Sequence, residues 1–545
     1  MNLAEEIEQL IDGDVFVDDE TLQKYSRDAS LFVVKPQLVI FPKNVDDIKK
    51  LVLFVGKNKD NYTNLSLTAR SAGSDMTGGP LNESIVLDFT KYLNNLKEIT
   101  NNYAVVEPGM FYRDFEVETL KRHRLFPSYP ASRDICAMGG IVANNAGGEK
   151  SLIYGKTIDY VEELKVILND GQEYSLKNLT ALELQAKIKQ NNFEGKLYRQ
   201  IYDLIDKNYN DIQKVKPRVS KNSSGYYLWS VWDKNNFNLA KLIVGSQGTL
   251  GIITEIKLRL TPKRDFTGLG VVFMKDLKHL AEVIRKVLPL KPSSFESFDD
   301  HTLKLALRFF PGFLKRLGAR NLISLGWRFL PDLWTILTFG MPKLVLLVEF
   351  EEDDQNRVDV KLLSLKNALV DTGAKVNLAI NKKQADKYWT IRRESFNLLR
   401  HKIKNRRTAP FIDDIIVEPE KLSEFLPKLY DILDHYQIFY TIAGHIGDGN
   451  FHIIPLMNLE NENERRKIYP AADEVYKLVL SYGGSISAEH NDGLIRSPYL
   501  EQMFGERIYK LFEETKKVFD PQNIFNPGKK VGASVEYAFK HIRTK

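Results

Sequence analysis

The chain has 545 residues, of which 43% are hydrophobic and 27% are charged, and its formal net charge is +6. This length exceeds what a single core usually supports, so we expect two or more domains, and the mild charge without a nucleic-acid motif gives no support for a nucleic-acid partner. Cys136 is the one cysteine, which excludes an internal disulfide, a cysteine-ligated zinc site and an iron–sulfur cluster.

The first residues form an acidic, amphipathic segment that does not resemble a secretory signal. No window of about 18 uninterrupted apolar residues occurs, so we expect no membrane-spanning helix and, by default, a cytoplasmic protein.

Apolar spacing predicts short helices over 3–11 and 45–57 and strands over 38–41, 65–70, 84–89 and 104–109. Segment 158–168 leads into Asn169-Asp170-Gly171, a strong hairpin signal, and helical patterns follow over 180–190 and 195–209. A strand-rich stretch over 242–262 closes this half, with a boundary expected after Pro262.

The second half alternates strand and helix patterns. Strands are predicted over 268–274 and 343–350, and helices over 276–288 and 357–371. This order is typical of an antiparallel sheet packed on helices.

A basic and aromatic insertion over 301–343 interrupts that pattern. It contains seven Lys or Arg, one Asp and many aromatic residues. One interpretation is a helical hairpin buried in the second domain. The other is an anchor on an anionic membrane surface, with the aromatic residues in the acyl boundary and the cations at the headgroups.

The chain has three glycine-rich segments, namely 69–81 (ARSAGSDMTGGPL), 127–155 (containing GGIVANNAGG) and 244–254 (VGSQGTLGIIT). The first comes directly after a strand-like run, and the third lies beside one. The small residues allow backbone N–H groups to converge on an anion such as a pyrophosphate. The first is neither a Walker loop nor a GxGxxG helix start. One such loop is a weak signal, but three in this order are much more specific.

Together these segments resemble the FAD-binding domain of the vanillyl-alcohol oxidase-like (PCMH-type) flavoproteins. The pattern is most similar to the branch that contains D-lactate dehydrogenase, the glycolate oxidase FAD subunit and D-2-hydroxyglutarate dehydrogenase, from about residue 30 to residue 530. The resemblance implies an α+β fold: a two-subdomain FAD-binding domain, a cap domain with an antiparallel sheet and helices, and a C-terminus that returns to the FAD domain. The expected ranges are 1–29 (N-terminal helical segment), 30–264 (FAD domain), 265–475 (cap) and 476–545 (C-terminal segment).

The resemblance also implies which residues hold FAD: Ser71, Ala72, Gly73, Ser74, Thr77, Pro130, Gly139, Gly140, Asn145, Gly147, Ile253 and Asn526. The chain departs from the family at Ala72, where a glycine is usual, and at Gln247, where a glutamate is usual. We expect FAD to be non-covalent, because the first loop has no histidine and Cys136 lacks the spacing of cysteine-linked relatives. Cys136 is interpreted as a packing residue.

The segment GHIGDGNFH at 444–452 places His445 and His452 on either side of a glycine turn, and SAEHNDG at 487–493 adds Glu489 and His490. Any one of these histidines could be an ordinary loop residue. Two imidazoles and a carboxylate are nonetheless a recognised ligand set for a divalent ion with open positions. The resemblance implies that His445, His452 and Glu489 bind a Zn- or Mn-like ion and that His490 is the catalytic base.

The substrate carboxylate needs a cation, and WTIRRES at 389–395 fits the family's W-x-x-R element, so Arg392 is the expected clamp. Arg393 is expected to be structural. Ile454 stands where D-2-hydroxyglutarate dehydrogenase has a polar Asn, which favours a smaller substrate. The pair Asp413-Asp414 could either support the site or solvate a strand edge.

The resemblance implies oxidation of a small D-2-hydroxy acid, with D-lactate as the first candidate, and electron transfer to a quinone or an electron-transfer protein. Glycolate and D-2-hydroxyglutarate are alternative substrates. A redox-neutral transferase of the alkylglycerone-phosphate synthase type and a membrane-docked, flavin-binding subunit without its own turnover are alternatives of other classes. A peripheral location on the inner face of the cell membrane would follow from the anchor interpretation of 301–343.

Overall fold

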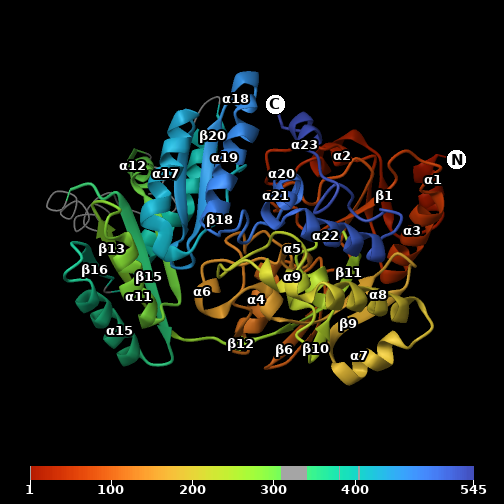
Figure 1. Cartoon of the computed structure of the whole chain (residues 1–545), viewed down its shortest axis with the longest axis horizontal. Helices are drawn as coiled ribbons and strands as arrows, with labels where there is room; N and C mark the ends of the chain where they lie inside the picture. Colours follow the sequence, from red (N-terminus) through yellow and green to blue (C-terminus); the bar gives the residue numbers. More distant parts are fainter. Residues whose placement is uncertain (1, 309–339, 380, 403–405, 545) are drawn as a thin grey trace.

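The computed structural model describes residues 2–308, 340–379, 381–402 and 406–544. Figure 1 shows two lobes, one formed by the first half of the chain and one formed mainly by the residues in green and cyan. The last helices of the chain return to the first lobe. The mixed α+β architecture predicted from the sequence is confirmed.

A small sheet at the start of the first lobe positions the first glycine-rich segment. Its spatial order is β1 (Asp14–Phe16), β2 (Leu38–Phe41), β4 (Ile85–Asp88) and β3 (Leu67–Arg70), with β2, β4 and β3 parallel. Helix α3 (Val45–Asn58) follows β2 and buries one apolar face, consisting of Ile48, Leu51, Val52 and Val55. Because β3 ends at Arg70, segment 71–81 lies at the carboxyl end of a buried strand.

A six-stranded antiparallel sheet completes the first lobe. Its order is β10 (Asn236–Asn238), β9 (Glu173–Thr180), β8 (Val161–Ile167), β11 (Ile252–Arg259), β6 (Tyr103–Val106) and β5 (Leu96–Ile99). The β8–β9 pairing confirms the hairpin predicted around residues 169–171, and α7 (Ala181–Ile188) and α8 (Phe193–Lys207) confirm the two helices.

The strand-rich run predicted over 242–262 is wrong in its first part. Helix α10 (Ala240–Ile243) and a loop precede β11, which begins at Ile252. Gly245 and Gly248 have φ values of 79° and 70°, and such positive values are incompatible with a strand. The third glycine-rich segment is therefore a loop for most of its length.

The second lobe is built on one antiparallel sheet. Its order is β16 (Lys375–Leu378), β13 (Phe266–Met274), β15 (Leu344–Glu352), β14 (Ser294–Asp299), β19 (Phe439–His445), β20 (Asn450–Met457) and β17 (Arg407–Thr408), and β18 (Ile415–Ile416) also pairs with β20.

Helices cover both faces of this sheet, which explains the nearly continuous apolar run in β15. Val348 and Phe350 pack in a core with residues of α11 (Leu280–Val287), α15 (Gln355–Ala368), α17 (Leu422–His435) and α19 (Ile468–Ser481). Val345 and Leu347 point to the other face and pack with Trp389 of α16 (Lys382–Lys402). A strand whose two faces are both buried has a nearly continuous apolar sequence.

The C-terminal segment returns to the first lobe, as the sequence predicted (Figure 1). Helix α22 (Glu506–Phe519) packs Phe512 into the same core as α8. Phe525 forms a parallel bridge to Leu67 of β3, and Ile542 bridges to Phe32.

The insertion over 301–343 begins in helix α12 (Asp300–Arg308), and residues 309–339 lie outside the described residues. Within the described part of the chain, no helix combines the length and apolarity needed to cross a membrane.

Candidate active site

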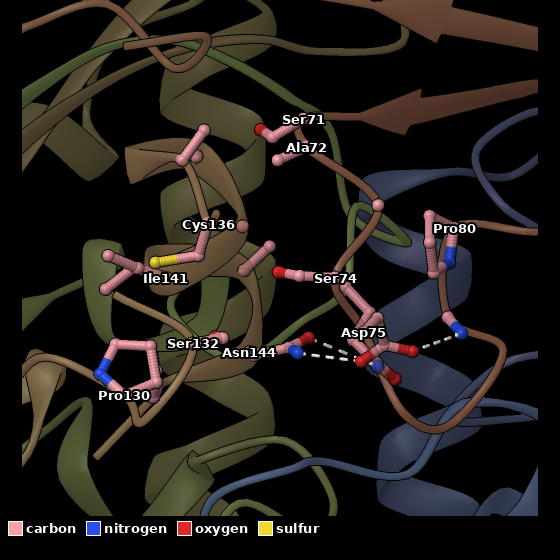
Figure 2. Close-up of a pocket in the computed structure, with 18 of the residues that line it drawn as sticks. Ser71, Ala72, Ser74, Asp75, Pro80, Pro130, Ser132, Cys136, Ile141 and Asn144 are labelled. Carbon is pink, nitrogen blue, oxygen red and sulfur yellow. Dashed lines mark hydrogen bonds between the residues drawn. The ribbon is translucent and has the colours of Figure 1, made fainter. Parts of the chain in front are cut away.

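Residues from all three glycine-rich segments line one cavity, together with histidines of the second lobe. Figure 2 shows Ser71, Ala72 and Ser74, on the loop after β3, opposite Cys136 and Ile141. A narrow space walled by backbone and small side chains suits a large, flat, anionic ligand.

Gly139 and Gly140 of the second segment form part of the cavity wall, which we call the Gly139–Gly140 wall. Their surroundings show how little space this wall leaves for side chains. A Cβ on Gly139 would lie 2.6 Å from Pro108 Cβ and 2.7 Å from Ser71 Oγ, so a larger residue does not fit there. A Cβ on Gly140 would meet nothing closer than Ser71 Cβ at 3.8 Å. Gly140 lines the cavity, so its missing side chain leaves room on the ligand side.

Most residues predicted to hold FAD line the cavity, namely Ser71, Ala72, Gly73, Ser74, Pro130, Gly139, Gly140, Gly147 and Ile253. Thr77, Asn145 and Asn526 are buried and hold the lining segments in place. Thr77 donates to Asp75 Oδ2 (2.7 Å), Asn145 Oδ1 accepts from Ile158 N (3.0 Å), and Asn526 Nδ2 donates to the carbonyl oxygens of residues 79 and 247.

Cys136 packs in the core of the first lobe and also forms part of the cavity wall. Burial raises the pKa of this thiol to about 12, so it is protonated at neutral pH.

A hairpin brings His445 and His452 together. Strands β19 and β20 are joined by a 3₁₀ turn (Ile446–Asp448) and Gly449, whose φ is 77°. A Cβ on Gly449 would lie 1.8 Å from Val417 O, so the turn requires glycine. The two imidazole rings lie 5.2 Å apart, centroid to centroid, as the glycine turn predicted.

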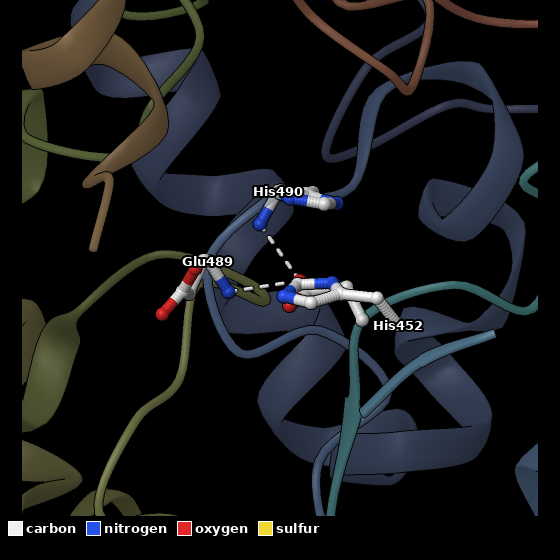
Figure 3. A group of neighbouring side chains, drawn as sticks. His452, Glu489 and His490 are labelled. Atoms are coloured by element: carbon white, nitrogen blue, oxygen red, sulfur yellow. Dashed lines mark hydrogen bonds between the residues drawn. The ribbon is translucent and has the colours of Figure 1, made fainter. Parts of the chain in front are cut away.

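Two adjacent aspartates hold the segment that carries Glu489 and His490. Asp414 Oδ2 accepts hydrogen bonds from the backbone N–H groups of Glu489 (2.8 Å) and His490 (2.7 Å), drawn in Figure 3. Asp413 Oδ2 lies 2.7 Å from His490 Nδ1, and Asp413 Oδ1 lies 3.2 Å from His452 Nδ1. Both aspartates are fully buried, so the pair supports the site and does not solvate a strand edge.

Glu489 completes the predicted group. Its Oε2 lies 3.4 Å from His445 Nε2, and both residues line the cavity with His452 and His490. Because Nδ1 of each of the three histidines faces a carboxylate, Nε2 is the nitrogen available to a ligand.

Among the described residues, the group whose ligand atoms all lie within 4.8 Å of one another is Asp414, His452, Glu489 and His490, and it does not include His445. Asp414 already accepts from two backbone N–H groups, Ser487 Oγ and Asn450 Nδ2. His445 adjoins this group, with its Nε2 3.4 Å from Glu489 Oε2. Two imidazoles and a carboxylate could hold a divalent cation with open positions.

Buried carboxylates favour the charged forms of His445 and His490. Burial disfavours the cationic form of His445, but Glu296, 2.5 Å from Nδ1, outweighs it and raises the pKa of His445 to about 9. Burial likewise opposes protonation of His490, and Asp413 and Asp414 raise its pKa to about 9. A dication held beside these rings would favour their neutral forms.

Arg392 lies just outside the residues that line the cavity. Its Nε is 2.7 Å from Glu296 Oε2, so Glu296 contacts both Arg392 and His445. Arg393 points elsewhere, and its Nη2 donates to both oxygens of Glu149 in the first lobe (2.7 and 2.8 Å). This agrees with the structural interpretation of Arg393.

Sequence reasoning did not identify Lys221 or Glu296. Lys221 comes from a loop of the first lobe, and its Nζ lies 2.6 Å from Glu489 Oε1 and 2.9 Å from Asp448 Oδ2. Burial disfavours its ammonium, but these two carboxylates raise the pKa of Lys221 above its ordinary value. Glu296 is one of two acidic residues in the strand Ser294–Asp299, so no local signal distinguishes it, and none marks Lys221.

Two family profiles match the chain: "FAD binding domain" over residues 36–177 and "FAD linked oxidases, C-terminal domain" over residues 265–530. A D-2-hydroxyglutarate dehydrogenase of Pseudomonas putida is 27% identical over 95% of this chain and 50% of its own length, and a D-lactate dehydrogenase of Archaeoglobus fulgidus is 27% identical over 91% of both chains. The chain thus spans about half the length of the first relative.

A solved structure has a similar fold. The 4-ethylphenol oxidase of Gulosibacter chungangensis, solved with isoeugenol, superposes on this chain with a TM-score of 0.68 at 16% sequence identity. The match covers 97% of this chain and 96% of the oxidase. That likeness confirms the predicted fold.

Proposed function

Because the chain belongs to the FAD-linked oxidases, we propose that it oxidises a small D-2-hydroxy acid, with D-lactate as the first candidate, to the 2-oxo acid. The observation that carries this proposal is the convergence of His445, His452, Glu489 and His490 on one wall of the glycine-lined cavity. The names of relatives, which include D-lactate and D-2-hydroxyglutarate dehydrogenases, support the same substrate class.

The cavity fits both groups that this reaction needs. The Gly139–Gly140 wall and the loop after β3 would hold FAD without a covalent bond, and His445, His452 and Glu489 would hold a divalent cation such as Zn or Mn. The chemistry supplied by the two groups is hydride acceptance by the flavin and polarisation of the substrate hydroxyl by the cation.

The residues of the chain would then move one proton and orient one carboxylate. His490 would take the hydroxyl proton at Nε2, because Asp413 holds its Nδ1. Arg392 would bind the substrate carboxylate, and Glu296 would fix the direction of its guanidinium. A quinone or an electron-transfer protein would be the final acceptor of the two electrons that the oxidation releases.

The decisive experiment is anaerobic flavin reduction followed by absorbance, with D-lactate, L-lactate, glycolate and D-2-hydroxyglutarate. We expect bleaching by D-lactate and not by L-lactate, loss of the reaction after chelation, and recovery with Zn²⁺ or Mn²⁺. Absence of bleaching with every 2-hydroxy acid in metal-replete protein would reject the proposal. Preferential bleaching by glycolate or D-2-hydroxyglutarate would reassign the substrate.

The alternatives of other classes have their own signatures. Measurable acyl-to-alkyl exchange would favour a redox-neutral transferase. Unchanged flavin reduction by the hydroxy acid in a His490→Ala variant would favour a flavin-binding subunit in which this histidine takes no part. Membrane docking through 301–343 predicts flotation with anionic liposomes, and equal flotation with neutral ones would end that idea.

A further inference from the structure

Lys221 is a buried cation in direct contact with the candidate metal site. Its side chain is 1% exposed, and it bridges Asp448 of the β19–β20 turn and Glu489 of the C-terminal segment. Lys221 Nζ donates a hydrogen bond to Glu489 Oε1, and the two atoms lie 2.6 Å apart. A positive charge this close to a cation-binding carboxylate weakens the attraction for a metal, so stability of the metal site alone does not explain its position.

The two oxygens of Glu489 face different partners. Oε1 accepts from Lys221 Nζ, whereas Oε2 lies 3.4 Å from His445 Nε2. Packing restricts the same group, since a Cβ on Gly147 would already be 3.1 Å from Oε1. The carboxylate is therefore held with one oxygen directed at the imidazole and the other directed at the ammonium.

We infer that Lys221 is a positioning residue that keeps Glu489 a one-oxygen ligand, so that two coordination positions stay open for a substrate that chelates through its carboxylate and its hydroxyl. This inference rests on the proposed metal site. A carboxylate can bind a cation through one or both oxygens, and a catalytic site differs from a structural one by its open positions. Without Lys221, Oε1 could turn to the metal and occupy a position that the substrate needs.

Two opposite effects distinguish this inference from a merely structural role. Removing a buried ammonium and freeing a second oxygen should tighten metal binding and weaken chelating ligands. If Lys221 only maintained the fold of the site, its loss should weaken metal binding, by the 10- to 100-fold typical of groups that support metal ligands.

The test compares flavin-loaded wild type and Lys221→Met by titration with Co²⁺, a spectroscopic probe, and then with oxalate or acetate. For Lys221→Met we expect Co²⁺ to bind about tenfold more tightly and oxalate, a two-oxygen chelator, about tenfold more weakly. Acetate, which needs one position, should change by less than about twofold. Weaker Co²⁺ binding, or unchanged oxalate binding, would overturn the inference.

Matched variants separate this result from misfolding and from failure of the metal site. Lys156→Met removes another buried amino group, one that donates to Asn222 O and Ala488 O, and should leave the oxalate-to-acetate ratio unchanged. If Lys221→Met does not fold, Lys221→Met/Asp448→Asn removes one charge of each sign and is expected to give the same two shifts. Equal Co²⁺ binding by wild type and His452→Ala would overturn the proposed metal site itself, and with it the inference.

Discussion

At the scale of single residues, buried carboxylates set the orientation of every histidine in the site. Asp413 contacts both His452 and His490, and Glu296 contacts His445 and Arg392. Each carboxylate thus joins a proposed metal ligand to a residue proposed to handle the substrate. Shared anchors of this kind fix the tautomer of an imidazole as well as its direction.

Asp413→Asn should therefore impair catalysis more than binding. An amide cannot stabilise His490 as it takes up a proton, so we expect kcat to fall by about 10²- to 10⁴-fold with little change in KM. Steady-state turnover with an artificial electron acceptor, at varied substrate concentration, measures both kcat and KM. Asp299→Asn, a buried carboxylate at the end of β14 and outside the cavity lining, is the matched control, and an equal loss in both variants would contradict a specific function of Asp413.

Cys136 should be inert in the native protein. The thiolate is the nucleophile, and burial raises the pKa of Cys136 to about 12, so reaction with iodoacetamide at pH 7 to 9 should be slow and should accelerate only above that range. Since the chain has one cysteine, labelling read by intact mass is unambiguous. Urea-unfolded protein provides the control for full reactivity. Rapid labelling of native protein at pH 7 would contradict the buried, neutral thiol.

At the scale of elements, loops that follow strands carry the site, while the strands and helices hold them rigidly. The loop after β3, the Gly139–Gly140 wall and the β19–β20 turn all depend on positions where a side chain would not fit or would fill the cavity. The apolar and turn signals of these elements were readable from the sequence. Segment 244–251 was identified as glycine-rich but was placed in a strand-rich run, which the positive φ angles of Gly245, Gln247 and Gly248 exclude.

Gly139→Ala and Gly140→Ala should have different consequences. The first forces a Cβ against Pro108 and should destabilise the protein by about 1–3 kcal/mol whether or not FAD is bound. The second places its Cβ in the cavity, so it should leave the Tm of FAD-free protein unchanged while lowering the flavin content. Differential scanning and the flavin-to-protein absorbance ratio give the two readouts. Normal flavin content in a folded Gly140→Ala variant would argue against this wall as the flavin site.

At the scale of the whole molecule, ion pairs across the lobes close the site. Lys150 of the first lobe contacts Glu349 and Glu351 of β15, with Nζ 3.4 Å from Glu349 Oε2, and its side chain is 11% exposed. Arg393 of α16 pairs with Glu149, but its side chain is 49% exposed. Glu149 and Lys150 are neighbours in the sequence, and the basic side chains of the two contacts differ in how much of each is exposed to water.

Lys150→Met should lower the stability of the assembled molecule more than Arg393→Met. Breaking the contact of the buried Lys150 leaves two carboxylates without their cation and should cost about 3 kcal/mol. Glu149 is 14% exposed but its partner Arg393 is half-exposed, so that pair should contribute about 1 kcal/mol. Urea unfolding of the flavin-loaded protein measures both changes. Equal midpoints for the two variants would contradict the importance of burial at this contact.

Local turn and glycine signals in the sequence predicted the hairpin around 169–171 and the three glycine-rich segments. The resemblance to a known family implied the fold class, and the motifs at 444–452 and 487–493 drew attention to His445, His452, Glu489 and His490. The tertiary structure decided which charged groups surround them. Lys221 and Glu296 reach the site from distant segments, and Arg392 meets a glutamate nearly a hundred positions away. A single sequence does not encode such pairings in any local pattern, since they arise only when separate strands and loops pack against one another.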